Sequence, residues 1–327
     1  MKVPGLVDLQ VEGYRGAEFP SPDLTKEDFV RLCRWIVESG TTAFLPTLHT
    51  VPEDLYKRNL SIIVSMLDTE ELGSRIPGVH IEGPFISPED GARGAHNAEW
   101  VRKPDVEYLS RMIEWADGKI KLLTIAAELE GAEELTRYAV EKGITVSLGH
   151  QMADEDDIAR LVSAGAKALT HLGNGVPQNL GRHRNPIWAG LANDDLSAMM
   201  ITDGHHLPPA IVKTFIRTKG IGRCIVISDG SPLVGMPAGR YRASGNDAVL
   251  DASGRLYNPH TGYLVGSSST MLQCMNYLAS LKLLSVEQLV KVGFYNPLKL
   301  IGVAPDSIPQ GPEIVFDEQQ NLFTICK

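Results

Sequence analysis

The sequence has few cysteines, no long apolar run and no cysteine pair of the C-x-x-C type. The cysteines lie far apart, at Cys33, Cys224, Cys274 and Cys326. This spacing argues against a disulfide framework and against a zinc knuckle. No apolar stretch approaches the roughly 18 residues of a membrane-spanning helix, and Pro4 and Asp8 interrupt the early apolar run that a signal peptide would need. These features predict a cytoplasmic protein with reduced thiols.

An excess of positive charge is also missing. The chain has 31 lysines and arginines against 40 aspartates and glutamates, a net charge of −9, which argues against nucleic acid and anionic membranes as partners. There is no G-x-S-x-G nucleophile elbow, no P-loop and no dinucleotide fingerprint after the first apolar run. The basic cluster at 181–184 (GRHR) is a candidate grip for phosphate or carboxylate, and its alternative is a solvated turn.

Short apolar runs alternate with helical patterns along most of the chain. The predicted strands cover 6–11, 42–48, 78–82, 121–127, 144–150, 168–171, 197–201 and 224–227. The predicted helices between them cover 24–39, 55–68, 106–115, 133–141, 154–165 and 209–218, with closing helices at 268–281 and 285–294. This alternation predicts a (β/α)8 TIM-type barrel over residues 1–305. An excursion at 241–266 holds a predicted hairpin (249–251 with 255–257), and 306–327 is predicted to be a short C-terminal β-hairpin tail.

Nearly every predicted strand ends in a polar side chain. The series is Gln10, His49, Glu82, Glu128, His150, His171, Asp203 and Asp229. Catalytic groups occupy that end of the strands in barrel enzymes. Between the two histidine strands, Asp154 and Asp157 can cap a helix that Gly165 ends, so the two strands should be parallel and should present both imidazoles at one edge.

Two histidines and a carboxylate at a barrel mouth match a hydrolytic zinc site. Zinc accepts neutral imidazole and carboxylate, and lowers the pKa of bound water to about 7. Spacing leaves the carboxylate ligand open between Glu82 and Glu128; the other reading of Glu128 is a supporting partner that orients a ligand histidine. Asp229 is the candidate base that takes the proton of the water.

Nine short motifs, which occur in one order over almost the whole chain, carry a family resemblance. They are 4–10 (PGLVDLQ), 80–85 (HIEGPF), 94–97 (GAHN), 147–150 (SLGH), 170–175 (THLGNG), 181–182 (GR), 203–206 (DGHH), 228–230 (SDG) and 264–268 (LVGSS). With these motifs the chain resembles the N-acetylglucosamine-6-phosphate deacetylases of the amidohydrolase superfamily. The resemblance implies metal-dependent hydrolysis of the acetamide of N-acetylglucosamine-6-phosphate, an amino-sugar phosphate, to glucosamine-6-phosphate and acetate.

The resemblance also implies roles for individual residues. The metal ligands would be Glu82, His150 and His171, holding one divalent ion, zinc first and iron or another divalent metal second. Asp229 would be the catalytic aspartate, and His96 would help to hold the acetyl carbonyl. The implied substrate contacts are Ala95, Asn174, Gly175, Arg182, His206, Leu264, Val265 and Gly266. Arg182 and His206 would lie near the phosphate, which in the family also meets a second subunit, so a homodimer is implied.

Four positions qualify the resemblance. Gln10 falls where many superfamily members carry a metal-binding His-x-His, which favours a mononuclear site, and Glu12 stands where the family tends to have asparagine. Gly173 and Gly175 replace larger residues of the substrate wall, and the loop after 182 is long. We also expect the small β-sandwich of the family to be vestigial, because the first motif begins at residue 4 and one hairpin ends the sequence.

Two alternatives stay open on the sequence. One is an amidohydrolase that acts on a different N-acyl sugar or on a cyclic amide. The other is a barrel without activity that serves as a binding protein.

Overall fold

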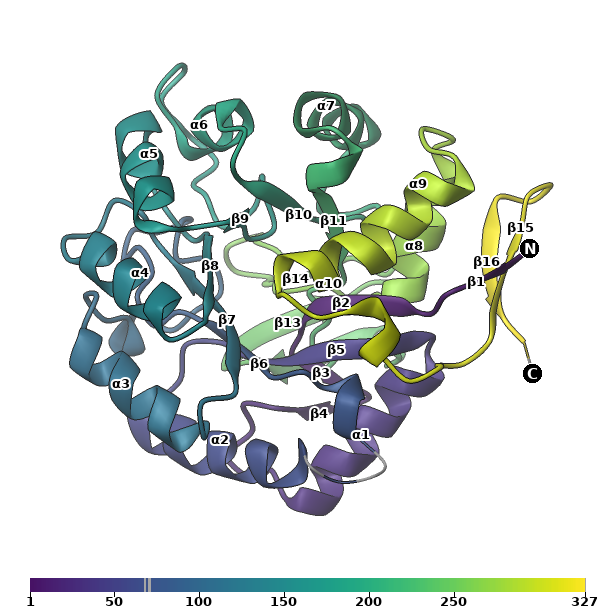
Figure 1. The fold of residues 1–327 in the computed structure, drawn as a ribbon, viewed down its shortest axis with the longest axis horizontal. Coiled ribbons are helices and arrows are strands. Elements are labelled where there is room, and N and C mark those ends of the chain that lie inside the picture. The colour runs from purple at the N-terminus through teal and green to yellow at the C-terminus, as the bar shows by residue number, and fades with distance from the viewer. Residues whose placement is uncertain (68, 70–71, 327) are drawn as a thin grey trace.

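The computed structural model describes residues 1–67, 69 and 72–326, and these form a barrel of parallel strands inside a ring of helices (Figure 1). In hydrogen-bonding order the strands of the barrel are β2 (Leu6–Val11), β5 (Thr41–Leu48), β6 (Val79–Glu82), β7 (Ile120–Ile125), β8 (Thr145–Leu148), β9 (Ala168–Leu169), β10 (Ser197–Ile201) and β11 (Cys224–Ile227). The backbone N–H of Asp229 donates to the carbonyl of Gln10, which closes the barrel between β11 and β2. The predicted (β/α)8 barrel is confirmed.

The helices follow from amphipathic patterns with capped ends. They are α1 (Lys26–Glu38), α2 (Glu53–Leu67), α3 (Val106–Trp115), α4 (Ala132–Glu141), α5 (Glu155–Ala164), α6 (Pro186–Ala192), α7 (Pro209–Lys219), α8 (Met271–Ser280), α9 (Val286–Val290) and α10 (Asn296–Leu300). Helix α5 has the predicted capping box of Asp154 and Asp157, and Gly165 ends it with a φ of 114°. Asp68, the last residue of one predicted helix, lies outside the described residues.

Several predicted elements differ in detail from the structure. The strands expected to end at His150 and His171 end at Leu148 and Leu169. The predicted helix 285–294 contains a π-helical turn (Lys291–Tyr295) between α9 and α10. The excursion is a three-stranded sheet of β12 (Gly239–Ala243), β13 (Asn246–Leu250) and β14 (Leu256–Tyr257), so the predicted hairpin was one strand short. The predicted strand 121–127 ends at Ile125, because the N–H of Ala126 leaves the sheet and donates to Phe85.

The tail forms the predicted hairpin of β15 (Ile314–Asp317) and β16 (Leu322–Ile325). Strand β1 (Lys2–Val3), which was not predicted, pairs antiparallel with β15. Both ends of the chain therefore meet in one small sheet at the side of the barrel (Figure 1).

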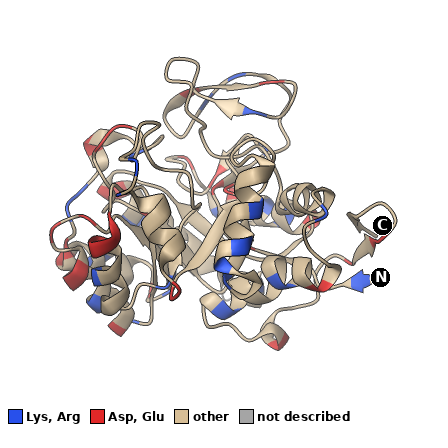
Figure 2. Cartoon of the chain, turned by 90° about the horizontal axis from the view of Figure 1, so that it is seen from above, with Lys and Arg blue, Asp and Glu red and all other residues tan. Residues whose placement is uncertain are grey.

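Surface and interior have different compositions. Lysine and arginine are interspersed with aspartate and glutamate over the outer helices (Figure 2). No helix within the described ranges is both long enough and apolar enough to span a bilayer. Inside the barrel, one apolar cluster includes Leu9, Leu45, Leu122, Met199 and Ile225, all at most 1% exposed. This packing joins strands β2, β5, β7, β10 and β11 inside the barrel.

Candidate active site

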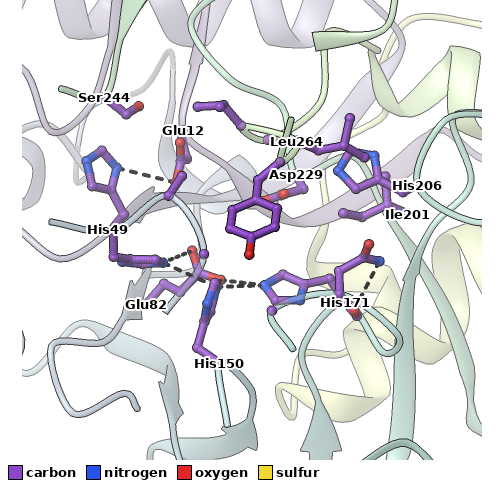
Figure 3. A pocket seen from close by; sticks show the side chains of 18 of the residues that line it. Glu12, His49, Glu82, His150, His171, Ile201, His206, Asp229, Ser244 and Leu264 are labelled. Carbon is purple, nitrogen blue, oxygen red and sulfur yellow. Dashed lines mark hydrogen bonds and ion pairs between the residues drawn. The ribbon is translucent and has the colours of Figure 1, made fainter. Parts of the chain in front are cut away.

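Three predicted metal ligands converge at the mouth of the barrel (Figure 3). Glu82 is the last residue of β6, and His150 and His171 follow β8 and β9 by two residues. One ligand atom from each lies within 4.8 Å of the others. His171 Nε2 is 3.0 Å from Glu82 Oε1 and 3.1 Å from His150 Nε2, and all three residues are buried. The spacing leaves a common point for one cation among three donors.

The backbone at the site is unusual in a way that aims these side chains. His150, His171 and Asp229 have φ angles of 52°, 30° and 49°, in the left-handed region that residues other than glycine rarely adopt. Such conformations cost free energy and cluster at functional sites. Each of the three lies two residues after the end of its strand, where the left-handed backbone turns its own side chain towards the site.

Hydrogen bonds set the tautomer of His150. Its Nδ1 lies 2.8 Å from the carbonyl oxygen of Ala92, which can only accept, so Nδ1 carries the proton and Nε2 has a free lone pair. Burial by itself would raise the pKa of Glu82, but hydrogen bonds and charge from His150 and His171 hold that pKa well below its usual range. Two imidazoles and one carboxylate match the donor set of catalytic zinc sites, so the residues present fit a metal.

Gln10 connects the ligands to the candidate base. Its Nε2 donates to Glu82 Oε1 at 2.8 Å and to Asp229 Oδ1 at 2.7 Å. Burial, followed by the negative charges of Glu82 and Glu12, raises the pKa of Asp229 well above its usual range, against the opposing charge of His171. A raised pKa makes Asp229 a stronger proton acceptor than an exposed aspartate.

His96 faces the same point from the loop after β6. The backbone N–H of Thr50 donates to His96 Nδ1 at 3.2 Å, so the proton of the neutral ring lies on Nε2. That Nε2 is 3.2 Å from His150 Nε2 and 3.6 Å from Glu82 Oε2. Burial and the neighbouring His150 lower the pKa of His96 well below its usual range, which keeps it a neutral donor. His96 therefore offers an N–H to an oxygen placed among the ligands.

Glu12 is paired with His49. His49 Nδ1 lies 3.3 Å from Glu12 Oε1, and both residues are under 10% exposed. Burial opposes the charge on His49, but Glu12 and then Glu18 and Glu82 raise its pKa to about 9. Glu12 also forms a second possible cation cluster with Glu82 and Asp229 within 4.8 Å. Sequence reasoning placed His49 only among the polar strand ends; its partner follows from the inward side-chain direction shared by Gln10 and Glu12.

The site opens into a cavity of about 860 Å³, including its open mouth. Most predicted substrate contacts line it, namely Ala95, His96, Asn174, Gly175, His206, Leu264, Val265 and Gly266. His206 holds Asp203 through Nδ1 at 2.7 Å, whereas His205 turns to the carbonyl of Ser253 in the excursion. No lysine or arginine belongs to this lining in the described part of the chain.

Two predicted residues lie elsewhere. Arg182 is exposed on the loop before α6 and does not line the cavity of the single chain; its carbonyl accepts from Trp188 Nε1 at 3.2 Å. The carboxylate of Glu128 accepts from the backbone N–H of Met152 at 2.9 Å. The group that orients His150 is the carbonyl of Ala92.

The glycines of the wall have a steric reason. At Gly175, where φ is 61°, an added Cβ would lie 3.0 Å from His171 Cε1 and 3.1 Å from His150 Nδ1. At Gly94, with the same φ, it would lie 3.0 Å from His150 Cε1. The two histidines therefore occupy space that larger residues at these positions would need.

Comparison with known proteins places the chain. No protein-family model matches the sequence. The N-acetylglucosamine-6-phosphate deacetylase of Bos taurus is 31% identical over 310 residues, which cover 92% of this chain and 74% of the relative. That of Vibrio furnissii is 30% identical over 303 residues, with the same two coverages. The chain belongs to the N-acetylglucosamine-6-phosphate deacetylase family.

Solved structures of the N-acetylglucosamine-6-phosphate deacetylase family have the same fold. The enzyme of Mycobacterium smegmatis, as a variant in complex with N-acetyl-D-glucosamine-6-phosphate, superposes with a TM-score of 0.87 at 26% identity, covering 99% of this chain and 84% of that one. The enzyme of Thermotoga maritima gives 0.84 at 28% identity, covering 98% and 85%. The amidohydrolase family is metal-dependent, in agreement with the Glu82, His150 and His171 cluster.

Proposed function

We propose that this protein hydrolyses the acetamide of N-acetylglucosamine-6-phosphate to glucosamine-6-phosphate and acetate, with one divalent metal held by Glu82, His150 and His171. Membership of the family supports the reaction. The observation that carries the proposal for this chain is the convergence of three metal donors and a buried aspartate, Asp229, on one cavity.

Charge supports a single ion, with zinc as the first candidate. Glu12 is paired with the charged imidazole of His49, so the carboxyl groups left for a metal are those of Glu82 and Asp229, and the raised pKa of Asp229 favours its neutral form until a cation binds. One divalent ion would offset both carboxylates, whereas a second would face the positive charge of His49. When bound, the metal supplies a Lewis acid that polarises the amide carbonyl and acidifies water.

The side chains supply positioning and proton transfer. Asp229 takes the proton of the attacking water and returns it to the leaving amine nitrogen, as its raised pKa favours. His96 donates a hydrogen bond from its Nε2–H to the amide oxygen as negative charge develops there. Gln10 holds the Asp229 carboxylate at 2.7 Å and so fixes its direction.

The Asp229→Asn variant tests this assignment. It is expected to bind one zinc ion per chain while turnover falls about 10³-fold, because the asparagine amide has the size of the aspartate carboxylate but not its basicity. Asp306→Asn, the same change at an exposed position, is the matched control and should keep full activity. Turnover near that of the parent in Asp229→Asn contradicts the role of the base.

Phosphate recognition is proposed to need groups beyond the single-chain cavity. Among the described residues that lining holds His206 but no lysine or arginine. We therefore place the phosphate near His206 and Arg182, with a second copy of the chain completing the site in a homodimer. Arg182→Gln is then expected to raise KM about tenfold or more for the 6-phosphorylated sugar and to leave the unphosphorylated sugar unaffected. Equal effects on both sugars contradict this placement of Arg182.

A second candidate is a different N-acyl sugar with less negative charge. The acidic Glu12 favours it, and so does a cavity whose described lining residues include no lysine or arginine. A hydrolysis panel with and without the 6-phosphate separates the candidates, because each predicts the opposite preference.

The remaining proposals concern organisation. We propose a catalytic barrel over 1–305 with the excursion at 241–266, and a tail over 306–327 whose sheet with β1 corresponds to a vestigial sandwich. A cytoplasmic location is proposed because Cys224 and Cys274 are buried thiols, which suit a reducing compartment. Separate expression of residues 1–305 tests whether the barrel folds without the tail.

A further inference from the structure

A layer of polar side chains lies inside the barrel beneath the site. Barrel interiors are usually filled by branched apolar residues, as the strands around Leu9, Leu45 and Ile225 are here. Nearer the carboxyl ends of the strands, two residues beyond Leu45 on β5 and beyond Leu122 on β7, the interior becomes polar. It holds Thr47, His80, Thr124, Ser147 and Thr170, each at most 2% exposed. Five buried polar groups in one interior require a reason, because each needs a hydrogen-bond partner to offset its burial.

These side chains form one chain of hydrogen bonds across the strands. His80 Nε2 is 2.8 Å from Thr124 Oγ1, which is 2.8 Å from Thr170 Oγ1, which is 2.6 Å from Ser147 Oγ. His80 Nδ1 lies 3.3 Å from Thr47 Oγ1. These hydrogen bonds thus join β5, β6, β7 and β8 to Thr170, the residue directly after β9.

Only one direction of hydrogen-bond donation gives every hydroxyl in this series an acceptor. Thr47 donates to the carbonyl of Leu45 at 3.2 Å, so His80 Nδ1 must donate to Thr47 and His80 Nε2 must accept. Each hydroxyl then has one acceptor, from Ser147 to Thr170 to Thr124 to His80. The opposite direction would leave the Ser147 proton without an acceptor among the described contacts. A chain satisfied in one direction holds its members in one geometry.

The layer contacts the backbone that carries the ligands. Thr170 directly precedes His171, and His80 shares the inward face of β6 with Glu82, two residues later. At Gly149, which precedes His150, an added Cβ would lie 2.8 Å from Thr170 Cβ and 3.2 Å from Thr124 Cγ2. The layer therefore packs directly under all three ligand positions.

Thr124 has the central place in this arrangement. The ligands come from β6, β8 and β9, and β7, which lies between them, supplies none. Yet Thr124 on β7 bonds His80 on β6 and Thr170, the residue directly after β9. We propose that His80, Thr124, Ser147 and Thr170 are positioning residues that set the spacing of the ligand strands and so the affinity for the metal. This inference rests on the proposed metal site.

The test compares Thr124→Val, which keeps the shape and removes the hydroxyl, with Thr124→Ser, which keeps the hydroxyl. The readout is the zinc dissociation constant, measured by competition with a chelator, and not activity. Thr124→Val is expected to bind zinc about tenfold to hundredfold more weakly, and Thr124→Ser to stay within about threefold of the parent. With zinc saturating, the KM of Thr124→Val should match that of the parent.

Leu122→Val separates positioning from general destabilisation. It shortens an inward side chain two residues earlier on the same strand, within the apolar cluster. It should lower thermal stability and leave zinc affinity within about threefold. If Thr124→Val does not fold, Ser147→Ala replaces it, because Ser147 is the terminal member of the series of hydrogen bonds. Ser147→Ala is expected to weaken zinc binding about threefold to tenfold. The inference is overturned if Thr124→Val, or Ser147→Ala where it replaces that variant, binds zinc as tightly as the parent. A parent protein that binds no zinc at the triad overturns the proposed function instead.

Discussion

The seam between the first and last barrel strands contains a buried carboxyl whose charge should be costly. Asp8 is 2% exposed and accepts hydrogen bonds from the N–H of Ser228 at 3.1 Å, from its hydroxyl, and from the N–H of Gln10 at 3.2 Å. Burial raises the pKa of Asp8 from 3.8 to about 6, and these hydrogen bonds only partly oppose it. The folded protein therefore keeps this proton at pH values where the unfolded chain has released it.

The sign and size of the effect follow from linkage. Stability from the neutral carboxyl is fully present below pH 3.8 and is lost as the pH rises through about 6. Each pKa unit corresponds to about 1.4 kcal/mol, so the charged form costs about 3 kcal/mol at pH 8. Asparagine resembles the neutral form, because its oxygen can accept both N–H groups and its amide can donate to the Ser228 hydroxyl. The free energy of unfolding of Asp8→Asn, compared with that of the parent, is thus expected to be up to about 3 kcal/mol higher at pH 8 than at about pH 4.

Urea unfolding of the metal-free proteins at several pH values measures this difference. The control is Asp306→Asn, which removes an exposed carboxylate and should give no pH-dependent difference. If the free-energy difference between Asp8→Asn and the parent is the same at about pH 4 and at pH 8, the reasoning is refuted.

Three further predictions follow from the site. Glu12→Gln should lower the pKa of His49 from about 9, so that imidazole NMR shifts report a neutral ring at pH 8; a ring that stays charged there would contradict the ion pair. Gly175→Ala should weaken zinc binding about tenfold or more in chelator competition, because its Cβ would press on His171. Unchanged affinity would show that the loop at 175 moves to make room for the added methyl group. Asp203→Asn should lower the free energy of unfolding by about 2 kcal/mol at pH 7, because the pKa of Asp203 is about 2 in the folded protein instead of 3.8. In unfolding experiments this loss should vanish below pH 2. A loss independent of pH would argue against an origin in the lowered pKa.

Much of the fold could be predicted because the chain repeats one local pattern. Several predicted spans, such as those of α3, β10 and β11, match the structure residue by residue. The additional strand β12 (GRYRA) was missed because only tertiary pairing with β13 makes this charged segment extended. The π-helical turn at 291–295 was missed for a similar reason, since no local residue pattern requires it.

The site was predictable in its chemistry but less so in its contacts. Strand ends and motifs indicated Glu82, His150 and His171, and the structure brings their donor atoms within 4.8 Å. Alternation along the first strand predicts that Glu12 faces inward, but its pairing with His49 also requires that β2 and β5 lie side by side. The place of Arg182 depends on a long loop and on a proposed second subunit, so a single sequence gives its type and not its position.

The central claim is that one metal ion at the Glu82, His150 and His171 triad supports deacetylation of N-acetylglucosamine-6-phosphate. The most direct measurement is acetate release from that substrate while zinc is titrated into metal-free protein. We predict that activity rises from zero in proportion to zinc and stops rising at one equivalent per chain. Full activity without metal, or a rise that continues to two equivalents, would contradict the account.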